Sequence, residues 1–100
     1  MNVIAIIPAR YASTRFPGKP LVDLHGKTML EMVWLAAKSA LSISAVAIAT
    51  DDDRVAQECF RIGADCIITD STLLSGTDRV AQAMQRAYPN ADIVLNVQGD

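Results

Sequence analysis

The amino-acid sequence predicts an α/β fold, a three-layer sandwich in which helices cover both faces of a mostly parallel β-sheet. The main observation is that short apolar runs alternate with longer amphipathic runs along the whole chain. The short runs are typical of strands buried on both faces, and the amphipathic runs of about 10–14 residues are typical of helices. Their alternation forms βαβ units, in which the strands are parallel and the helices lie on the faces of the sheet.

Turn and capping residues divide the chain into these elements. Four strands are expected, at residues 2–7, 44–50, 66–69 and 92–97. Three helices are expected between them, at about 28–41, 51–62 and 75–88. Thr28 and Glu31 have the spacing of a capping box at the start of the first helix, and Gly63 is placed to end the second. His25 and Gly26 are expected to form a turn.

The composition is typical of one small soluble domain. Hydrophobic residues make up 51% of the 100 residues, and the 5% of aromatic residues predicts an aliphatic core. With no targeting signal and no apolar run of membrane-spanning length, we expect a cytoplasmic protein without membrane contact. The net charge of −2 argues against nucleic acid as a partner. Cys59 and Cys66 form no CxxC pair and are expected to be reduced and packed.

The loop after the first predicted strand, residues 8–20, is the strongest candidate for chemistry. It carries three cations within ten residues: Arg10, Arg15 and Lys19. Its backbone is restricted by four residues: Pro8, Pro17, Gly18 and Pro20. Ligands of open α/β sheets bind at the carboxyl ends of the strands, and a stiff cationic loop there suits a triphosphate. A solvated basic loop is the alternative, and both the P-loop pattern and GxGxxG are absent.

Four separated blocks of the sequence resemble one known family. They are IIPARYASTRFPGKPL at 6–21, ATDDDRV at 49–55, SGTDR at 75–79 and NVQGD at 96–100. Together they resemble the sugar-nucleotide cytidylyltransferases, and most closely the branch that acts on 3-deoxy-manno-octulosonate (Kdo), the CMP-Kdo synthetases. The resemblance implies a Rossmann-like, nucleotide-diphospho-sugar transferase-like fold. It also implies that residues 1–100 are the CTP-binding N-terminal part of a longer catalytic domain.

In this family the anomeric hydroxyl of the sugar attacks the α-phosphorus of CTP and expels pyrophosphate. The resemblance puts Arg10, Arg15 and Lys19 on the triphosphate, with Arg15 and Lys19 as catalytic residues that offset charge on the departing pyrophosphate. It implies that Pro8 and Ala9 present backbone groups to the cytosine.

The resemblance also places Ser75 beside the base. Three residues at this point have an alternative role as helix caps only: Ser75, Thr77 and Asp78. The acidic run Asp51-Asp52-Asp53 is interpreted as a helix cap rather than as a metal site.

The last block supplies a candidate metal ligand. Asp100 follows the fourth predicted strand and the turn residue Gly99, where a carboxylate would face the ligand edge and bind Mg²⁺ together with phosphate oxygens. The alternative is that Asp100 only terminates the strand. The resemblance implies a second acidic ligand beyond Asp100, and Gln98 as a contact to the acceptor sugar. Because the strand at 92–97 is expected inside a sheet, we expect the chain to be part of a longer protein.

One position departs from the family. Relatives often carry histidine two residues before the SGTDR block, where this chain has Leu73, and the change suggests a variant acceptor such as an amino-substituted octulosonate. The resemblance further implies a homodimer and a role in lipopolysaccharide synthesis.

Three alternatives to this interpretation are considered. The first is a cytidylyltransferase for a sialic-acid-like sugar, and the second is a truncated CTP-binding module without turnover. The third is a signalling receiver domain, which the sequence disfavours because Pro8, Ala9 and Arg10 follow the first strand in place of an acidic pair.

Overall fold

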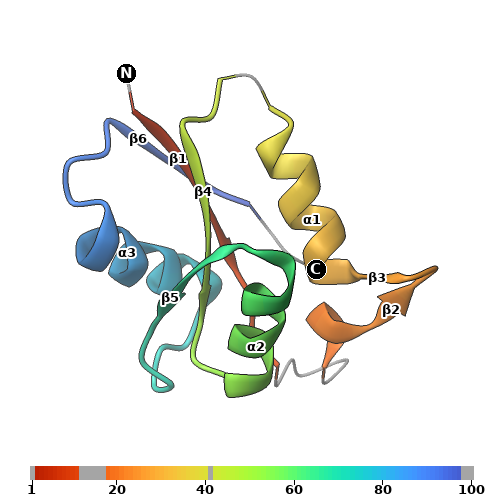
Figure 1. The fold of residues 1–100 in the computed structure, drawn as a ribbon. Helices are drawn as coiled ribbons and strands as arrows, with labels where there is room; N and C mark the ends of the chain where they lie inside the picture. The colour runs from red at the N-terminus through yellow and green to blue at the C-terminus, as the bar shows by residue number, and fades with distance from the viewer. Residues whose placement is uncertain (1, 12–17, 41, 98–100) are drawn as a thin grey trace.

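A computed structural model describes residues 2–11, 18–40 and 42–97, and these residues form a parallel sheet with helices on both faces (Figure 1). The sheet has four strands in the order β5-β4-β1-β6, and all three pairings between neighbours are parallel. The α/β prediction is therefore confirmed.

The two central strands are buried and the two outer strands are partly exposed. Strand β1 is Val3–Pro8 and strand β4 is Ala45–Thr50, and each is buried along almost its whole length. Strand β5 is Asp65–Ile68 and strand β6 is Ile93–Asn96. In the described part of the chain β6 pairs only with β1, so the strand that the sequence places inside a sheet lies at its edge here.

The three predicted helices are present. Helix α1 is Met29–Lys38, α2 is Asp53–Ile62 and α3 is Gly76–Ala87. The amide of Glu31 donates to the Thr28 hydroxyl (3.1 Å), as the capping motif predicts. Helix α1 ends before the predicted limit of 41, and its C-cap is Ser39, whose hydroxyl donates to the carbonyl of Ala36 (2.8 Å).

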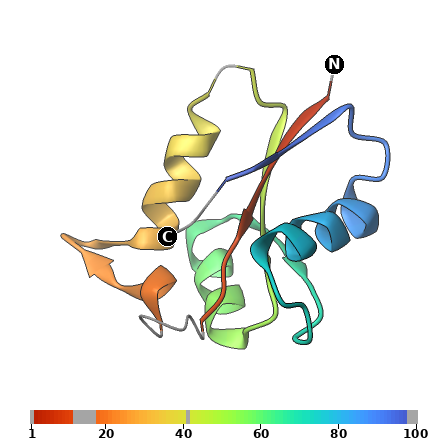
Figure 2. The same ribbon diagram turned by 180° about the vertical axis from the view of Figure 1, so that it is seen from behind.

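The order of the strands creates a switch point between β1 and β6. The chain runs from β1 to β4 to β5 in one direction and then returns across the sheet to β6, on the other side of β1. Helices α1 and α2 pack on one face of the sheet, and α3 packs on the other (Figures 1 and 2). Ligands of open α/β sheets bind outside the carboxyl ends of the strands at such a switch point.

A short helix and a hairpin between β1 and α1 were not predicted. The 3₁₀ helix η1 is Lys19–Leu21, and the hairpin is formed by β2 (Asp23–Leu24) and β3 (Lys27–Thr28). The hairpin projects from the body of the molecule (Figure 2). Its turn is formed by His25 and Gly26, as expected, and the Gly26 amide donates to the Asp23 carboxylate (3.1 Å). Two-residue strands carry too short a pattern to be recognised by alternation.

Two hydrophobic clusters, one on each face of the sheet, form an aliphatic core with a single buried tryptophan in the described residues, Trp34. Cys59 is buried in the first cluster and Cys66 packs against it, both as free thiols, as predicted. A hydrogen bond with the Cys66 thiol, together with burial, raises the pKa of Cys59. This cysteine therefore stays a protonated, packed thiol.

A polar network ties α1 and the hairpin to α2. Glu58 of α2 is buried, accepts a hydrogen bond from the Thr28 hydroxyl (2.5 Å), and is bound by Arg61 through Nε and Nη2 (2.6 and 2.7 Å). Arg61 also reaches Glu31 (3.0 Å). The Arg61 guanidinium, with the Thr28 hydroxyl, holds the pKa of Glu58 below its ordinary value. This network fixes the start of α1 and thereby the segment that leads back to Lys19.

Replacing Glu58 by Gln should weaken the fold and reduce its acid sensitivity. We expect a loss of about 1–2 kcal/mol in the free energy of unfolding at pH 7, because Gln keeps the shape but not the charge-assisted bonds. Since the pKa of Glu58 is lowered on folding, its contribution is present above the ordinary pKa of a glutamate and is lost as the pH falls through the lowered value. Urea denaturation across this range measures both effects. Equal pH slopes for wild type and Glu58→Gln would contradict the assignment.

Candidate functional site

The carboxyl ends of β1 and β6 lie side by side, as predicted for the two ends of the site. Ile6 is in register with Asn96, and the Val97 amide donates to the Ile6 carbonyl (3.0 Å). The chain therefore leaves β1 and β6 at the same edge of the sheet, next to the switch point. The predicted sugar contact Gln98 and the predicted metal ligand Asp100 lie outside the described residues.

Pro8 and Ala9 form the buried floor of this edge. Pro8 is the last residue of β1, and Ala9 is 2% exposed. The Ala9 amide donates to the carbonyl of Ala49 in β4 (2.9 Å), and proline has no amide hydrogen. Any hydrogen bond from the backbone of these two residues to a ligand would therefore use a carbonyl oxygen as acceptor.

The cationic loop is closed at its base by a short hydrogen bond. The Gly18 amide donates to the Tyr11 carbonyl (2.6 Å), which brings the two ends of the loop together. Arg10, which is exposed, precedes this closure, and Lys19, which is half-buried, follows it at the start of η1. The structure thus brings two of the three predicted cations to adjoining backbone positions at the exit of β1. Arg15 lies outside the described residues.

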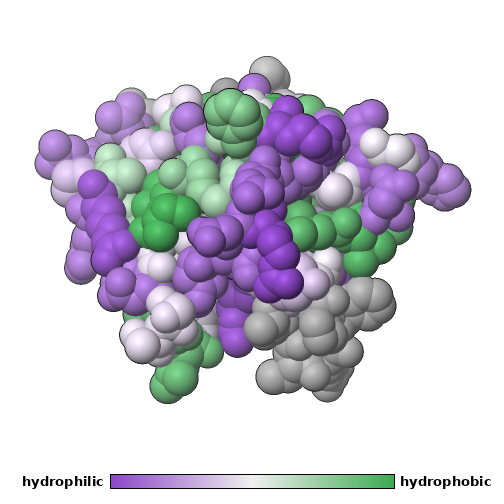
Figure 3. Space-filling view, turned by 60° about the horizontal axis from the view of Figure 1, so that its bottom comes forward, coloured by the Kyte–Doolittle hydropathy of each residue, from purple (hydrophilic) through white to green (hydrophobic). Residues whose placement is uncertain are grey.

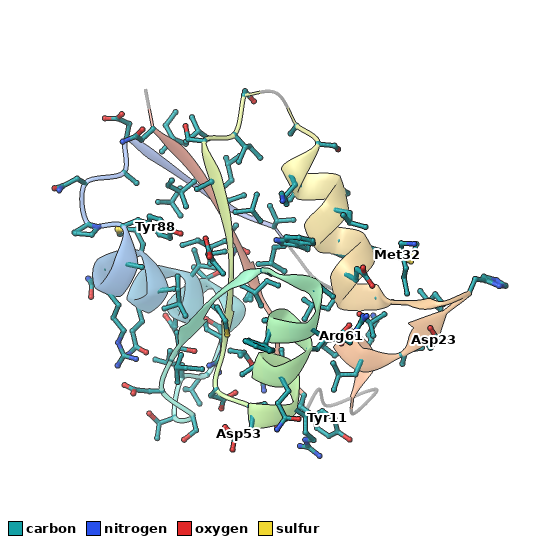
Figure 4. The ribbon with its side chains drawn as sticks, viewed as in Figure 1. Tyr11, Asp23, Met32, Asp53, Arg61 and Tyr88 are labelled. Atoms are coloured by element: carbon teal, nitrogen blue, oxygen red, sulfur yellow. The ribbon has the colours of Figure 1, made fainter. Side chains whose placement is uncertain are left out.

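Tyr11 and Arg54 hold the closed loop against α2, and the sequence analysis did not identify either residue. The Arg54 guanidinium stacks on the Tyr11 ring, 3.2 Å from its centroid, beside the first turn of α2 (Figure 4). Arg54 also donates through Nε and Nη2 to Asp52 (3.2 and 2.8 Å) and so lowers the pKa of that carboxyl. The signal was present in the block at 49–55, where an arginine follows the acidic run.

The start of α3 meets the end of β1. Ser75 is the N-cap of α3, and its hydroxyl accepts from the amide of Asp78 (3.1 Å), while Thr77 and Asp78 are exposed residues of the first turn. A Cβ atom at Gly76 would lie 3.3 Å from Cγ of Pro8. Only glycine allows this approach without displacement, so the structure places Ser75 next to the exit of β1.

The acidic run at the end of β4 is occupied by capping and ion pairing. Asp52 caps α2 by accepting from the amides of Arg54 and Val55 (2.8 and 3.2 Å), as predicted. Asp51 pairs with Arg79 of α3 (3.7 Å). Within residues 2–11, 18–40 and 42–97, no group of three or more His, Cys, Asp or Glu side chains could hold a metal ion.

The surface around the loop side of the molecule is largely hydrophilic. The view with the bottom of Figure 1 turned forward shows mostly hydrophilic residues with small separate hydrophobic areas (Figure 3). None of the helices in the described part of the chain is long and apolar enough to cross a membrane.

The strand order, the switch point and the loop after β1 define an open α/β protein with a ligand site expected at the carboxyl ends of its strands. Residues 4–100 match the family described as cytidylyltransferase, and the chain belongs to this family. It is 48% identical over all of its 100 residues to 3-deoxy-manno-octulosonate cytidylyltransferase of Cytophaga hutchinsonii, and it covers 40% of that protein. It is 44% identical over 101 aligned positions to 8-amino-3,8-dideoxy-manno-octulosonate cytidylyltransferase of Shewanella woodyi, and it covers 41% of that one.

A solved structure agrees with this assignment. The whole chain superimposes on CMP:2-keto-3-deoxy-manno-octonic acid synthetase complexed with CTP, with a TM-score of 0.94 and 42% identity, and covers 41% of that chain. The nucleotide-diphospho-sugar transferase-like fold and the similarity to the CMP-Kdo synthetases are thus confirmed. The chain spans about two fifths of the length of the relatives it matches.

Gly18→Ala should destabilise the protein more than Gly63→Ala does. Both glycines have left-handed backbones, with φ of 78° and 80°, so both variants carry a backbone strain of about 1–2 kcal/mol. A Cβ at Gly18 would also lie 3.2 Å from the Tyr11 ring, whereas nothing lies within 4 Å of one at Gly63. Denaturation of the two variants should differ by about 1 kcal/mol, and Tyr11→Ala should abolish the difference. Equal losses of unfolding free energy in the two variants would show that the Tyr11 ring does not restrict a side chain at Gly18.

Proposed function

We propose that this chain carries the CTP-binding part of a cytidylyltransferase that activates 3-deoxy-D-manno-octulosonate to CMP-Kdo with release of pyrophosphate. The observation that carries the proposal is the meeting of three features at one edge of the sheet. These are the closed cationic loop after β1, the floor made by Pro8 and Ala9, and the N-terminus of α3 at Ser75. The relatives at 44–48% identity support the nucleotide and the type of sugar.

The floor of the site is suited to a cytosine base. With the Ala9 amide bound to Ala49 and no amide hydrogen on Pro8, the backbone of these two residues could offer a ligand only carbonyl oxygens, which are acceptors. The exocyclic amino group of cytosine is a hydrogen-bond donor, whereas the corresponding group of uracil is an acceptor. Carbonyl oxygens at the end of β1 would therefore favour CTP over UTP. Ser75 directly precedes Gly76, which lies against Pro8, and we propose that it borders the same base.

The loop cations are suited to the triphosphate. Lys19 and Arg10 flank the hydrogen-bonded closure, and Arg15 belongs to the same loop. When the anomeric hydroxyl attacks the α-phosphorus, the bond to the bridging oxygen breaks and negative charge accumulates on the leaving pyrophosphate. Cations held in place before the reaction stabilise that charge without reorganisation, which is the catalytic role we propose for Arg15 and Lys19.

Mg²⁺ is part of the proposal through Asp100. A carboxylate following β6, at the edge where β1 ends, offers the oxygen ligand that Mg²⁺ prefers. Because the described residues hold no group of three or more His, Cys, Asp or Glu side chains that could bind a metal ion, the remaining ligands would be phosphate oxygens, water and an acid elsewhere in the protein. Bound Mg²⁺ would supply positive charge to the phosphate oxygens.

Several finer features belong to the proposal. The contact of Gln98 with the acceptor sugar, a homodimeric assembly, a cytoplasmic location and a role in lipopolysaccharide synthesis all rest on the relatives. The acceptor itself is tested by supplying CTP, Mg²⁺ and a panel of Kdo, 8-amino-Kdo and a sialic acid to the protein and measuring pyrophosphate release. Kdo should be the preferred acceptor. Faster pyrophosphate release with 8-amino-Kdo would contradict this and assign the acceptor of the Shewanella woodyi relative instead.

Lys19→Ala should weaken CTP binding at least tenfold, because it removes a positive charge from the triphosphate site. Calorimetry with CTP and Mg²⁺ measures the effect, and inorganic pyrophosphate should lose affinity to a similar extent. Lys27→Ala removes an equal charge from the exposed hairpin and serves as the matched control. Unchanged affinity in Lys19→Ala, or an equal loss in both variants, would count against the proposed phosphate site.

A further inference from the structure

Arg79 is a buried cation in the second turn of α3. Its side chain is 1% exposed, and one guanidinium nitrogen, Nη1, donates to the Thr69 hydroxyl (2.6 Å) and to the Asp70 carbonyl (3.3 Å). The same nitrogen lies 3.7 Å from the Asp51 carboxylate. The Nε atom is buried without a hydrogen-bond partner in the described structure.

This arrangement is expensive for a residue whose only role is to support the fold. A buried charge has to be desolvated, and a single carboxylate at 3.7 Å offsets only part of that cost. An unpartnered Nε adds to it. Apolar residues of similar volume often replace buried ion pairs without loss of stability. A role in positioning α3 relative to the ends of β4 and β5 would account for a buried arginine at this place.

The elements that Arg79 joins meet at the carboxyl ends of the strands, where the proposed nucleotide site lies. Asp51 follows β4, and Thr69 follows β5, so the guanidinium connects the carboxyl ends of two strands to α3. The backbone amide of Arg79 donates to the carbonyl of Ser75 (3.2 Å), in the first turn of the helix. One residue after Ser75, Gly76 packs against the ring of Pro8. Arg79 thus fixes the start of α3 relative to the floor of the site.

We propose that Arg79 is a positioning residue that holds the N-terminus of α3, with Ser75, against Pro8 and thereby shapes the base side of the nucleotide site. This inference rests on the proposed function. Arg79 acts through the helix start, because its hydrogen bonds and its ion pair are with Thr69, Asp70 and Asp51. Replacing Arg79 should therefore weaken the binding of the cytosine base and leave the binding of the phosphates unchanged.

Helix α3 offers a matched control in Arg86. Arg86 lies on the same side of the helix and grips the same segment, donating to the Ile68 carbonyl (2.6 Å) and to the Asp70 carboxylate (3.2 Å). It is seven residues further along, roughly 10 Å from Arg79, and its side chain is 45% exposed. Arg86→Met removes comparable hydrogen bonds from the end of β5 and leaves the contacts of Arg79 with Thr69, Asp70 and Asp51 in place.

The test compares CTP with pyrophosphate, which lacks the base, in calorimetry at a temperature where all variants are folded by circular dichroism. Arg79→Met should raise the Kd for CTP at least tenfold and leave the Kd for pyrophosphate within twofold of wild type. Arg86→Met should leave both within twofold. Arg79→Lys keeps the charge and should recover part of the CTP affinity.

Asp51→Asn provides a second variant should Arg79→Met not fold. It keeps the bonds of Arg79 to Thr69 and Asp70 and removes only the ion pair, and it should raise the Kd for CTP about threefold with pyrophosphate unchanged. Three results would overturn the inference on Arg79 while leaving the proposed function standing. They are an equal loss of affinity for CTP and pyrophosphate, an equal loss of CTP affinity in Arg86→Met, and CTP affinity within twofold of wild type in every folded variant of Arg79 and Asp51. A wild-type protein that binds neither ligand overturns the proposed function, and the inference with it.

Discussion

The parallel pairing of β1 between β4 and β6 is the constraint on which the rest of the structure depends. β1 is buried on both faces, so its neighbours are fixed in register and in direction. Parallel strands end at the same edge of a sheet, and this edge is where Pro8, Ala9 and the cationic loop lie beside the exit of β6. β1 and β6 form the switch point of the strand order, and ligands of open α/β sheets bind at such a point.

Polar contacts at the ends of the helices hold the loops of this edge in place. Arg54 stacks on Tyr11 on the α2 side, and Arg79 ties α3 to the exits of β4 and β5. Further from the edge, Glu58 binds Thr28 and Arg61 binds Glu31, and these contacts anchor the segment that follows Lys19 to α2. Each contact joins parts of the chain that are distant in sequence, so each loop is positioned by neighbours rather than by its own turns. A ligand site built in this way is preorganised, and less entropy is lost when a ligand binds.

The sequence was most informative where a short-range rule applies. Continuous apolar runs located the four strands, because strands inside a covered sheet are buried on both faces. Helical periodicity located the three helices, because burial on one face imposes a period on the apolar residues. Capping chemistry located the start of α1 at Thr28 and the start of α2 within the acidic run, of which Asp52 is the cap, because a cap and the amide that it binds are only two or three residues apart. For α3 it offered Ser75 only as an alternative to a base contact, and Ser75 is the N-cap. Hydrophobic periodicity did not predict η1 or the hairpin of β2 and β3, because these elements are too short to show a period.

The sequence by itself determined the fold class, the family resemblance and the identity of the loop cations. Only the tertiary structure decided that Pro8 meets Gly76, that Tyr11 lies under Arg54 and that Arg79 spans to Asp51 and Thr69. The physical reason is distance along the chain. Periods, caps and turns are set by residues within a few positions of one another, whereas these contacts join residues from 10 to 68 positions apart, which only the packed sheet brings together.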